Sequence, residues 1–172
     1  MATDLQFIKS VSSSSSVTSV DITDCFSANY DVYMLSFADI DIDGAGDENI
    51  DIRLLDSVGT AISASEYDYA GLVLRYSTTF SEVRETSASQ FLYGAGYVSA
   101  SDVGAGGLIA YIYNPYDSSS YTFLQHQQAN SANHSGQKYI GVHKSAEQIS
   151  GIQIRVDSGT IERLSASIYG VK

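Results

Sequence analysis

The sequence predicts an all-β protein, more specifically an antiparallel, jelly-roll-like β-sandwich of about eight to ten strands. Three observations support this fold class. Apolar residues alternate with polar ones at a period of two along most of the chain, and β-branched and aromatic residues gather in short runs. Gly, Ser, Asn and Asp separate these runs at short intervals. No long stretch has helical spacing, which excludes a parallel sheet with crossover helices.

The N-terminal segment contains two short candidate strands, 7–11 and 17–22, joined by the serine run Ser12–Ser16. We interpret this run as a flexible or edge-strand connection. The alternative is an extended arm that becomes ordered only on a neighbouring subunit, with Phe7 and Ile8 as its apolar anchor.

The next two candidate strands, 30–42 and 50–55, flank the acidic run DIDIDGAGDENIDI. Asp alternates with Ile at both ends of this run. We therefore predict that the two ends form a hairpin closed by the loop DGAGDEN between them. In that arrangement Asp39, Asp41 and Asp51 form a charged surface that faces a neighbour.

The acidic run also matches the opening of an EF-hand calcium loop. The twelfth position of such a loop needs a bidentate Glu, but here it holds Ile50, and no helix is expected on either side. The hairpin is therefore favoured, and a cation site in the loop remains the alternative. Its candidate ligands for Ca²⁺ are Asp43, Asp47 and Glu48; no other cofactor is expected.

The remaining candidate strands follow at regular intervals. Segment 108–113 is apolar on both faces, which is typical of a central strand, and the turn after it contains the only proline of the chain. Single helical turns are expected at 23–29 and 145–150. The other candidate strands are 72–77, 90–93, 121–127, 139–143, 152–156 and 161–169.

Length and composition indicate one domain. A chain of 172 residues, of which 44% are hydrophobic, can bury a substantial core, and no linker divides it. We expect an N-terminal arm or edge segment over residues 1–20 and a single β-sandwich domain over residues 21–172. The lone Cys25 cannot form an intrachain disulfide, and its apolar neighbours indicate a buried thiol without a catalytic role.

The net charge of −11 arises in the first part of the chain. Residues 1–70 carry thirteen acidic residues against Lys9 and Arg53, whereas residues 71–172 carry seven of each sign. Such a surface repels phosphate backbones, so no nucleic-acid partner is expected. The acidic part is either a solvated face or a patch that binds a basic partner in a salt-sensitive way. No signal peptide or membrane-spanning run is recognised, so we expect synthesis in a cytoplasm and no membrane partner.

Motifs for catalysis are missing from the sequence. We find no nucleophile elbow or phosphate-binding loop, and the three histidines, His126, His134 and His143, have no partner at zinc-motif spacing. We interpret His126 and His143, which fall in candidate strands, as structural histidines, and we predict that the protein is not an enzyme. A pair of acids for glycoside hydrolysis is defined by the distance between the two carboxyl groups in the folded protein, and not by their spacing in the sequence. Such a pair therefore remains an alternative. The acids available for such a pair are Glu66, Asp68, Glu82 and Glu85.

Thirteen tyrosines and no tryptophan are a further feature of the composition. Tyrosine combines a wide apolar ring with a polar tip, which suits protein interfaces and sugar-binding platforms. Because most of these tyrosines fall in candidate strands, packing within the sandwich is the favoured interpretation.

Four segments resemble a group of small β-sandwich virion proteins of tailed bacteriophages, especially phages of marine and cyanobacterial hosts. The segments are SVDITDCFSANYDVYMLSF, RLLDSVGTAISASEYDYAGLVL, GGLIAYIYNPYDSSSYTFL and ISGIQIRVDSGTIERLSASIYGVK, which together extend over nearly the whole chain. The resemblance rests on the order of the strands, the NP turn and the SGTI…YGV ending. It assigns no functional residue.

The resemblance implies a non-enzymatic component of a virion, jelly-roll-like in fold and usually multimeric. The favoured role is a capsid decoration or cement protein that binds the major capsid protein or other virion proteins, as a homo-oligomer and preferably a trimer. One alternative is a tail-fibre or receptor-binding tip that holds a host glycan. A small tail adaptor is the second alternative.

Overall fold

Twelve antiparallel strands form two sheets in the computed structural model, which describes residues 5–44, 46–76, 79–99, 106–130 and 135–172. Most of the described residues lie in strands, and none of them lies in a helix. The strands are β1 (Leu5–Ser13), β2 (Ser19–Ile22), β3 (Val32–Asp43), β4 (Asp47–Leu55), β5 (Tyr67–Arg75), β6 (Ser81–Ala88), β7 (Tyr97–Ser99), β8 (Gly106–Tyr113), β9 (Thr122–Asn130), β10 (Ser135–His143), β11 (Gly151–Val156) and β12 (Thr160–Val171).

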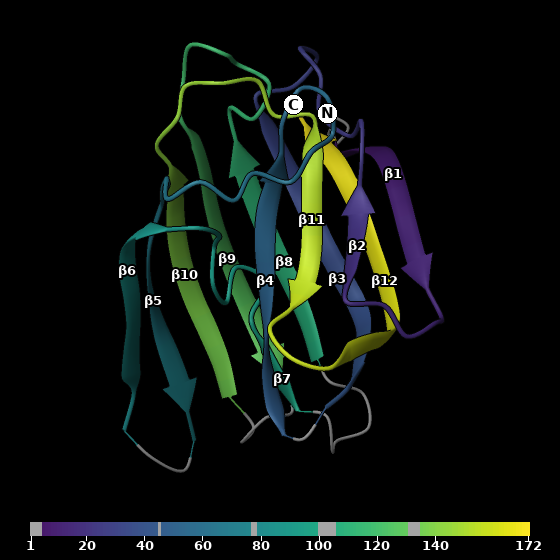
Figure 1. Cartoon of the computed structure of the whole chain (residues 1–172), viewed down its shortest axis with the longest axis vertical. Coiled ribbons are helices and arrows are strands. Elements are labelled where there is room, and N and C mark those ends of the chain that lie inside the picture. The colour runs from purple at the N-terminus through teal and green to yellow at the C-terminus, as the bar shows by residue number, and fades with distance from the viewer. Residues whose placement is uncertain (1–4, 45, 77–78, 100–105, 131–134) are drawn as a thin grey trace.

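The two sheets pack face to face, as Figure 1 shows with the smaller sheet in front. The large sheet has eight strands in the order β1-β12-β3-β8-β9-β10-β5-β6, and the small sheet has four in the order β2-β11-β4-β7. Within them, β1-β12-β3-β8 faces β2-β11-β4-β7, and the chain passes back and forth between the two sets. That is the eight-stranded pattern of a jelly roll, so the predicted fold class is confirmed.

Two hairpins account for the strands in excess of the expected eight to ten. β5 and β6 are inserted between β4 and β7, and β9 and β10 between β8 and β11. All four join the large sheet beyond β8. In Figure 1 they lie to the left of β4, so the small sheet does not cover them. Connecting segments cover their inner faces instead.

The core lies between the sheets and follows from the alternation of apolar residues. On β3, for example, Tyr33, Leu35 and Phe37 point inward and are at most 4% exposed. Burying such side chains stabilises the sandwich by roughly 1.5–3 kcal/mol each. Strands of both sheets contribute to this core, with Ile50, Ile52, Leu54, Ile112, Leu124, Ile152, Ile154 and Ile168 all almost completely buried.

Three predictions about local structure are wrong. The segments 30–42 and 50–55 do not form a hairpin, because β3 belongs to the large sheet and β4 to the small one. At 90–93 only Phe91 pairs, through a bridge to Ile52, and the strand β7 follows later. No helical turn occurs at 23–29 or 145–150.

Strand β6 was not predicted from the sequence, because its residues, SEVRETSA, are mostly polar on both faces. An edge strand tolerates such a sequence, since charged residues there discourage pairing with another chain.

The N-terminal segment is ordered against the body of the protein, because β1 pairs along its length with β12 at the other edge of the large sheet. No helix in the described residues is long and apolar enough to cross a membrane.

Two isoleucines on β8 test which face is buried. Ile112 is fully buried, whereas Ile109 is 49% exposed on the opposite face. We expect Ile112→Ala to lower the free energy of unfolding by about 2–5 kcal/mol, and Ile109→Ala to lower it by less than about 1 kcal/mol. Urea unfolding of the two variants measures the difference. Equal losses would contradict the assignment of the inner face.

Candidate functional site: the outer face of the large sheet

The outer face of the large sheet has no covering layer among the described residues. Because side chains alternate along each strand, and neighbouring strands are in register, outward residues line up in rows across the sheet. One row runs from Leu5 on β1 to Val142 on β10, and the next from Phe7 on β1 to Ala70 on β5.

These two rows are mainly apolar and aromatic, and we call them the outer band. The first row consists of Leu5, Val171, Val32, Tyr113, Phe123 and Val142. The second consists of Phe7, Tyr169, Met34, Tyr111, Gln125, Ile140 and Ala70. Several of its side chains are exposed, with Ile140 60%, Phe7 53% and Phe123 43% exposed.

The outer band is large enough to matter for association. Strands lie about 4.8 Å apart and alternate residues about 6.7 Å apart, so one row across six strands and one across seven cover on the order of 400 Å². Patches of that size are comparable to the largest apolar patches on monomers, which often mark binding sites. A groove of about 350 Å³ lies beside the band, and Tyr111, Gln125, Gln127, Lys138 and Ile140 line it.

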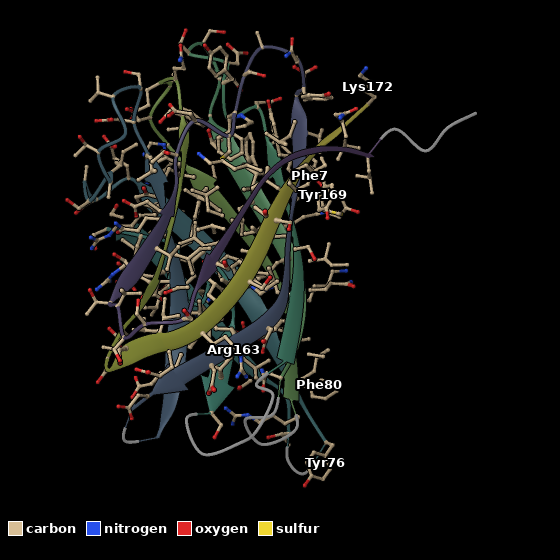
Figure 2. All side chains as sticks on the ribbon, turned by 90° about the vertical axis from the view of Figure 1, so that its right-hand side faces the viewer. Phe7, Tyr76, Phe80, Arg163, Tyr169 and Lys172 are labelled. Atoms are coloured by element: carbon tan, nitrogen blue, oxygen red, sulfur yellow. The ribbon has the colours of Figure 1, made fainter. Side chains whose placement is uncertain are left out.

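The N-terminal anchor residues predicted from the sequence separate in the structure. Phe7 is exposed and belongs to the outer band, where its ring meets that of Tyr169 edge-on at 5.8 Å. Figure 2 shows these two side chains together near the edge formed by β1 and β12. Ile8 points the other way and packs against the core. Only Phe7 is therefore available to a neighbour.

Asp39 and Asp41 lie on the surface, as predicted, but they are not free charges. Arg163 on β12 brings its Nε to 2.7 Å from Asp39 and its Nη2 to 3.5 Å from Asp41. All three side chains are between 38% and 49% exposed, so the ion pairs contribute little stability. They do neutralise part of the acidic surface expected to face a basic partner.

The prediction that Asp51 is an exposed interface residue is wrong, because Asp51 is fully buried. Its Oδ2 accepts a hydrogen bond of 2.7 Å from Gln90 Nε2, and its Oδ1 accepts one of 2.9 Å from the Tyr93 amide. Arg155 donates to Gln90 Oε1 and lies 3.9 Å from the carboxylate. Asp51 therefore fixes the 90–93 turn beside β4, a structural task that strand alternation alone does not reveal.

Burial raises the pKa of Asp51 to about 7, and the charge of Asp157 adds to this effect, while the Tyr93 amide and Arg155 oppose it. Burial also shifts the pKa values of Cys25 and His126. Desolvation raises the pKa of Cys25 to about 12, in agreement with the predicted buried thiol. Desolvation lowers the pKa of His126 to about 4, while its Nε2–H donates to the Tyr93 carbonyl at 2.9 Å.

The calcium candidates are only partly described. Asp43 ends β3 and is exposed, and Glu48 lies on β4 with its side chain close to Gly44. The side chain of Asp47 lies outside the described residues, and so does His134. The described part of the chain therefore neither assembles nor excludes this site.

A different group of metal-binding side chains is brought together by the fold. Glu66, His143 and Glu147 offer donor atoms that all lie within 4.8 Å of one another. His143 ends β10, and burial lowers its pKa in spite of the two carboxylates. Sequence spacing gave no signal for this cluster, because Glu66 is distant in the chain and no helix joins His143 to Glu147.

Two of the acids considered for glycoside hydrolysis, Asp68 and Glu85, have other partners. Asp68 forms an ion pair of 2.8 Å with Lys144, and Glu85 accepts a hydrogen bond of 3.0 Å from Tyr69 Oη. The Lys144 hydrogen bond, together with the amide of Ser87, lowers the pKa of Asp68. These contacts suit structural roles.

Comparison with known proteins adds little. No protein-family model matches the chain, and no curated protein matches it. It is similar to a solved structure titled "Structure of infectious bursal disease virus Gx strain", at 12% sequence identity and a TM-score of 0.15. The match covers 96% of this chain but only 38% of that chain. A likeness of this strength carries no argument about fold or function.

The buried Asp51 carboxyl predicts a pH effect on stability. The folded protein keeps a proton on Asp51 up to about pH 7, whereas the unfolded chain releases it near pH 4. The free energy of unfolding contributed by this group therefore falls as pH rises between these values, by up to about 4 kcal/mol. Urea unfolding of wild type and Asp51→Asn, measured from pH 4 to 8, should show wild type losing stability relative to the variant. A constant difference would show that Asp51 is ionised throughout.

Proposed function

We propose that this chain is a non-enzymatic structural protein of a virus particle that attaches to neighbouring subunits through the outer band. The observation that carries the proposal is the pair of apolar and aromatic rows across an uncovered sheet face. Exposed apolar surface of this extent favours burial against another protein. The jelly-roll topology and the resemblance of four sequence segments to phage virion proteins support the same class.

The finer proposal is a capsid decoration protein of a tailed bacteriophage, acting as a homo-oligomer. The outer band, on the order of 400 Å², is smaller than the roughly 800 Å² that each partner contributes to a standard interface. A single copy would then bind modestly. Many copies on one shell, or several joined in an oligomer, bind far more firmly because each engaged copy raises the effective concentration of the next.

The edges of the large sheet are less suited to this contact than its face. On β6, Glu82, Arg84 and Glu85 are exposed along the strand, which discourages the addition of another strand. At the opposite edge, Lys9 of β1 is held by a hydrogen bond of 2.6 Å from its Nζ to the Thr23 carbonyl. Association is therefore expected to bury side chains of the face.

A receptor-binding tip is the second candidate function, and the groove beside the outer band favours it. Tyr111 lies opposite Gln125, and Gln127 is two residues further along the same strand, on the same face. A tyrosine ring that offers stacking area beside amide groups that donate and accept hydrogen bonds is suited to a sugar. The small tail adaptor would use the band as a protein contact, in the same way as the decoration protein.

A charge placed at Ile140, a 60% exposed residue of the outer band, tests the proposal. We expect Ile140→Glu to reduce binding of the purified protein to particles that lack it at least tenfold, because a buried carboxylate without a partner is costly. Co-sedimentation measures the binding. Val58→Glu is the matched control, since Val58 is an 83% exposed apolar residue in the 56–60 turn, outside the band. Circular dichroism would verify that both variants fold.

The behaviour of the particles separates the candidate functions. Particles without a decoration protein lose resistance to heat, and adding wild-type protein but not Ile140→Glu restores it. Particles without a receptor-binding tip keep that resistance and lose adsorption to cells. Binding to the particle that is unaffected by Ile140→Glu would refute the outer band as the contact.

A further inference from the structure

The strongest unexplained feature is the side-chain cluster Glu66, His143 and Glu147, at the end of the large sheet where the chain crosses to the small sheet. His143 is fully buried, and its Nε2 lies 3.3 Å from Glu66 Oε2 and 3.8 Å from Glu147 Oε1. Neither ring nitrogen makes a well-formed hydrogen bond within the described residues. A buried imidazole without such a bond is costly, so a further partner for it is expected.

From this geometry we infer that Glu66, His143 and Glu147 bind a divalent transition-metal ion, with Zn²⁺ as the best fit. The inference is independent of the proposed function. An imidazole nitrogen with two carboxylate oxygens is a donor set that Zn²⁺ accepts readily. Ca²⁺ and Mg²⁺ prefer sites made only of oxygen, and are therefore less suited.

The spacing of the donor atoms agrees with a tetrahedral ion. Bonds of about 2.0–2.1 Å to Zn²⁺ place two ligand atoms about 3.3–3.4 Å apart. The two distances from His143 Nε2, 3.3 and 3.8 Å, lie close to that value. The carboxylates of Glu66 and Glu147 lie within 4.8 Å of each other and are 38% and 34% exposed, so they are free to close on the ion.

Charge balance supports the same assignment. Two carboxylates in one cluster repel each other, and together with a neutral imidazole they carry a charge of about −2, which a divalent ion cancels. The nearest lysine in sequence does not serve this purpose. Lys144 Nζ is engaged with Asp68 at 2.8 Å.

The backbone around the cluster is held in place before any ion binds. The Lys144 amide donates to the Glu66 carbonyl at 2.8 Å, which fixes the two segments that carry Glu66 and His143. Further along, the Ile149 amide donates to the Pro115 carbonyl at 2.8 Å, and the Ser150 amide to the Leu55 carbonyl at 2.9 Å. An ion would therefore tie the connection between β10 and β11 to the start of β5. Its fourth coordination position would face solvent.

Calorimetric titration of the metal-free, untagged full chain with ZnCl₂ tests the site. We expect one Zn²⁺ per chain, an increase in Tm of about 5 °C or more at a hundredfold excess over Kd, and an intense visible absorption with Co²⁺ as probe. Glu66→Gln and Glu147→Gln should each weaken Zn²⁺ binding at least tenfold. Both side chains are half-exposed, so these variants are expected to fold even if His143→Gln is not.

Two control variants guard against binding elsewhere. Glu82→Gln removes an exposed carboxylate on β6, and His134→Asn removes a histidine other than His143. Both should bind Zn²⁺ as wild type does. The assignment is overturned by the absence of binding at about 100 μM Zn²⁺, a concentration far above the Kd of a built site. It is equally overturned if His134→Asn abolishes binding while the two cluster variants retain it.

Discussion

Coverage of one face of a wide sheet is the constraint on which the rest of this structure depends. Eight strands side by side expose far more apolar surface than a four-stranded sheet can cover. The small sheet packs on the jelly-roll half, and the inner faces of β5, β6, β9 and β10 must be covered by connecting chain. The segment between β6 and β7 does this by running along the free edge of β4, where Ile50 and Ile52 form backbone hydrogen bonds to it.

Close packing of that segment explains several residues that carry no chemistry. The buried Phe91 ring meets Tyr67 edge-on at 4.8 Å and occupies space that a side chain at position 141 would need, so Gly141 leaves room for it. Gly96 has a φ of 96°, a backbone conformation in which any residue with a side chain is strained, and it lies against the Gln128 side chain. Asp51 anchors the same segment through its two hydrogen bonds. Asp51 is thus buried because it holds the segment that covers the inner face of the extension.

The inner layer of the extension is also more polar than the jelly-roll core. His126 stacks on Tyr139 with ring centroids 4.8 Å apart, and Tyr139 stacks on Tyr69 at 5.5 Å. Stacked rings supply buried area. His126 Nε2–H donates to the Tyr93 carbonyl of the covering segment, and Tyr69 Oη donates to Glu85. The opposite face of the same strands keeps its apolar residues in the open. An uncovered apolar face on a scaffold of this rigidity suits assembly with other subunits, and the metal cluster at one end would stiffen the crossing between the sheets.

The sequence by itself determined the fold class, because period-two alternation is a local property that each strand carries independently. It also located most strands, predicted that Cys25 is buried, and placed His126 and His143 on strands. It could not determine which strands pair. The assignment of β3 and β4 to different sheets depends on long-range packing, so the predicted hairpin between them is wrong. For the same reason Asp51 was predicted to be exposed, although it is buried.

The candidate sites were decided only by the tertiary structure, for the same reason. The outer band consists of one or two residues from each of seven strands of the large sheet. No single segment of the sequence shows that these residues share an uncovered face. Glu66 meets His143 because β5 pairs with β10, which places Tyr67 opposite His143 and Glu66 just beyond it. Alternation fixes which way a side chain points along its own strand. Only the pairing of distant strands fixes what it points toward.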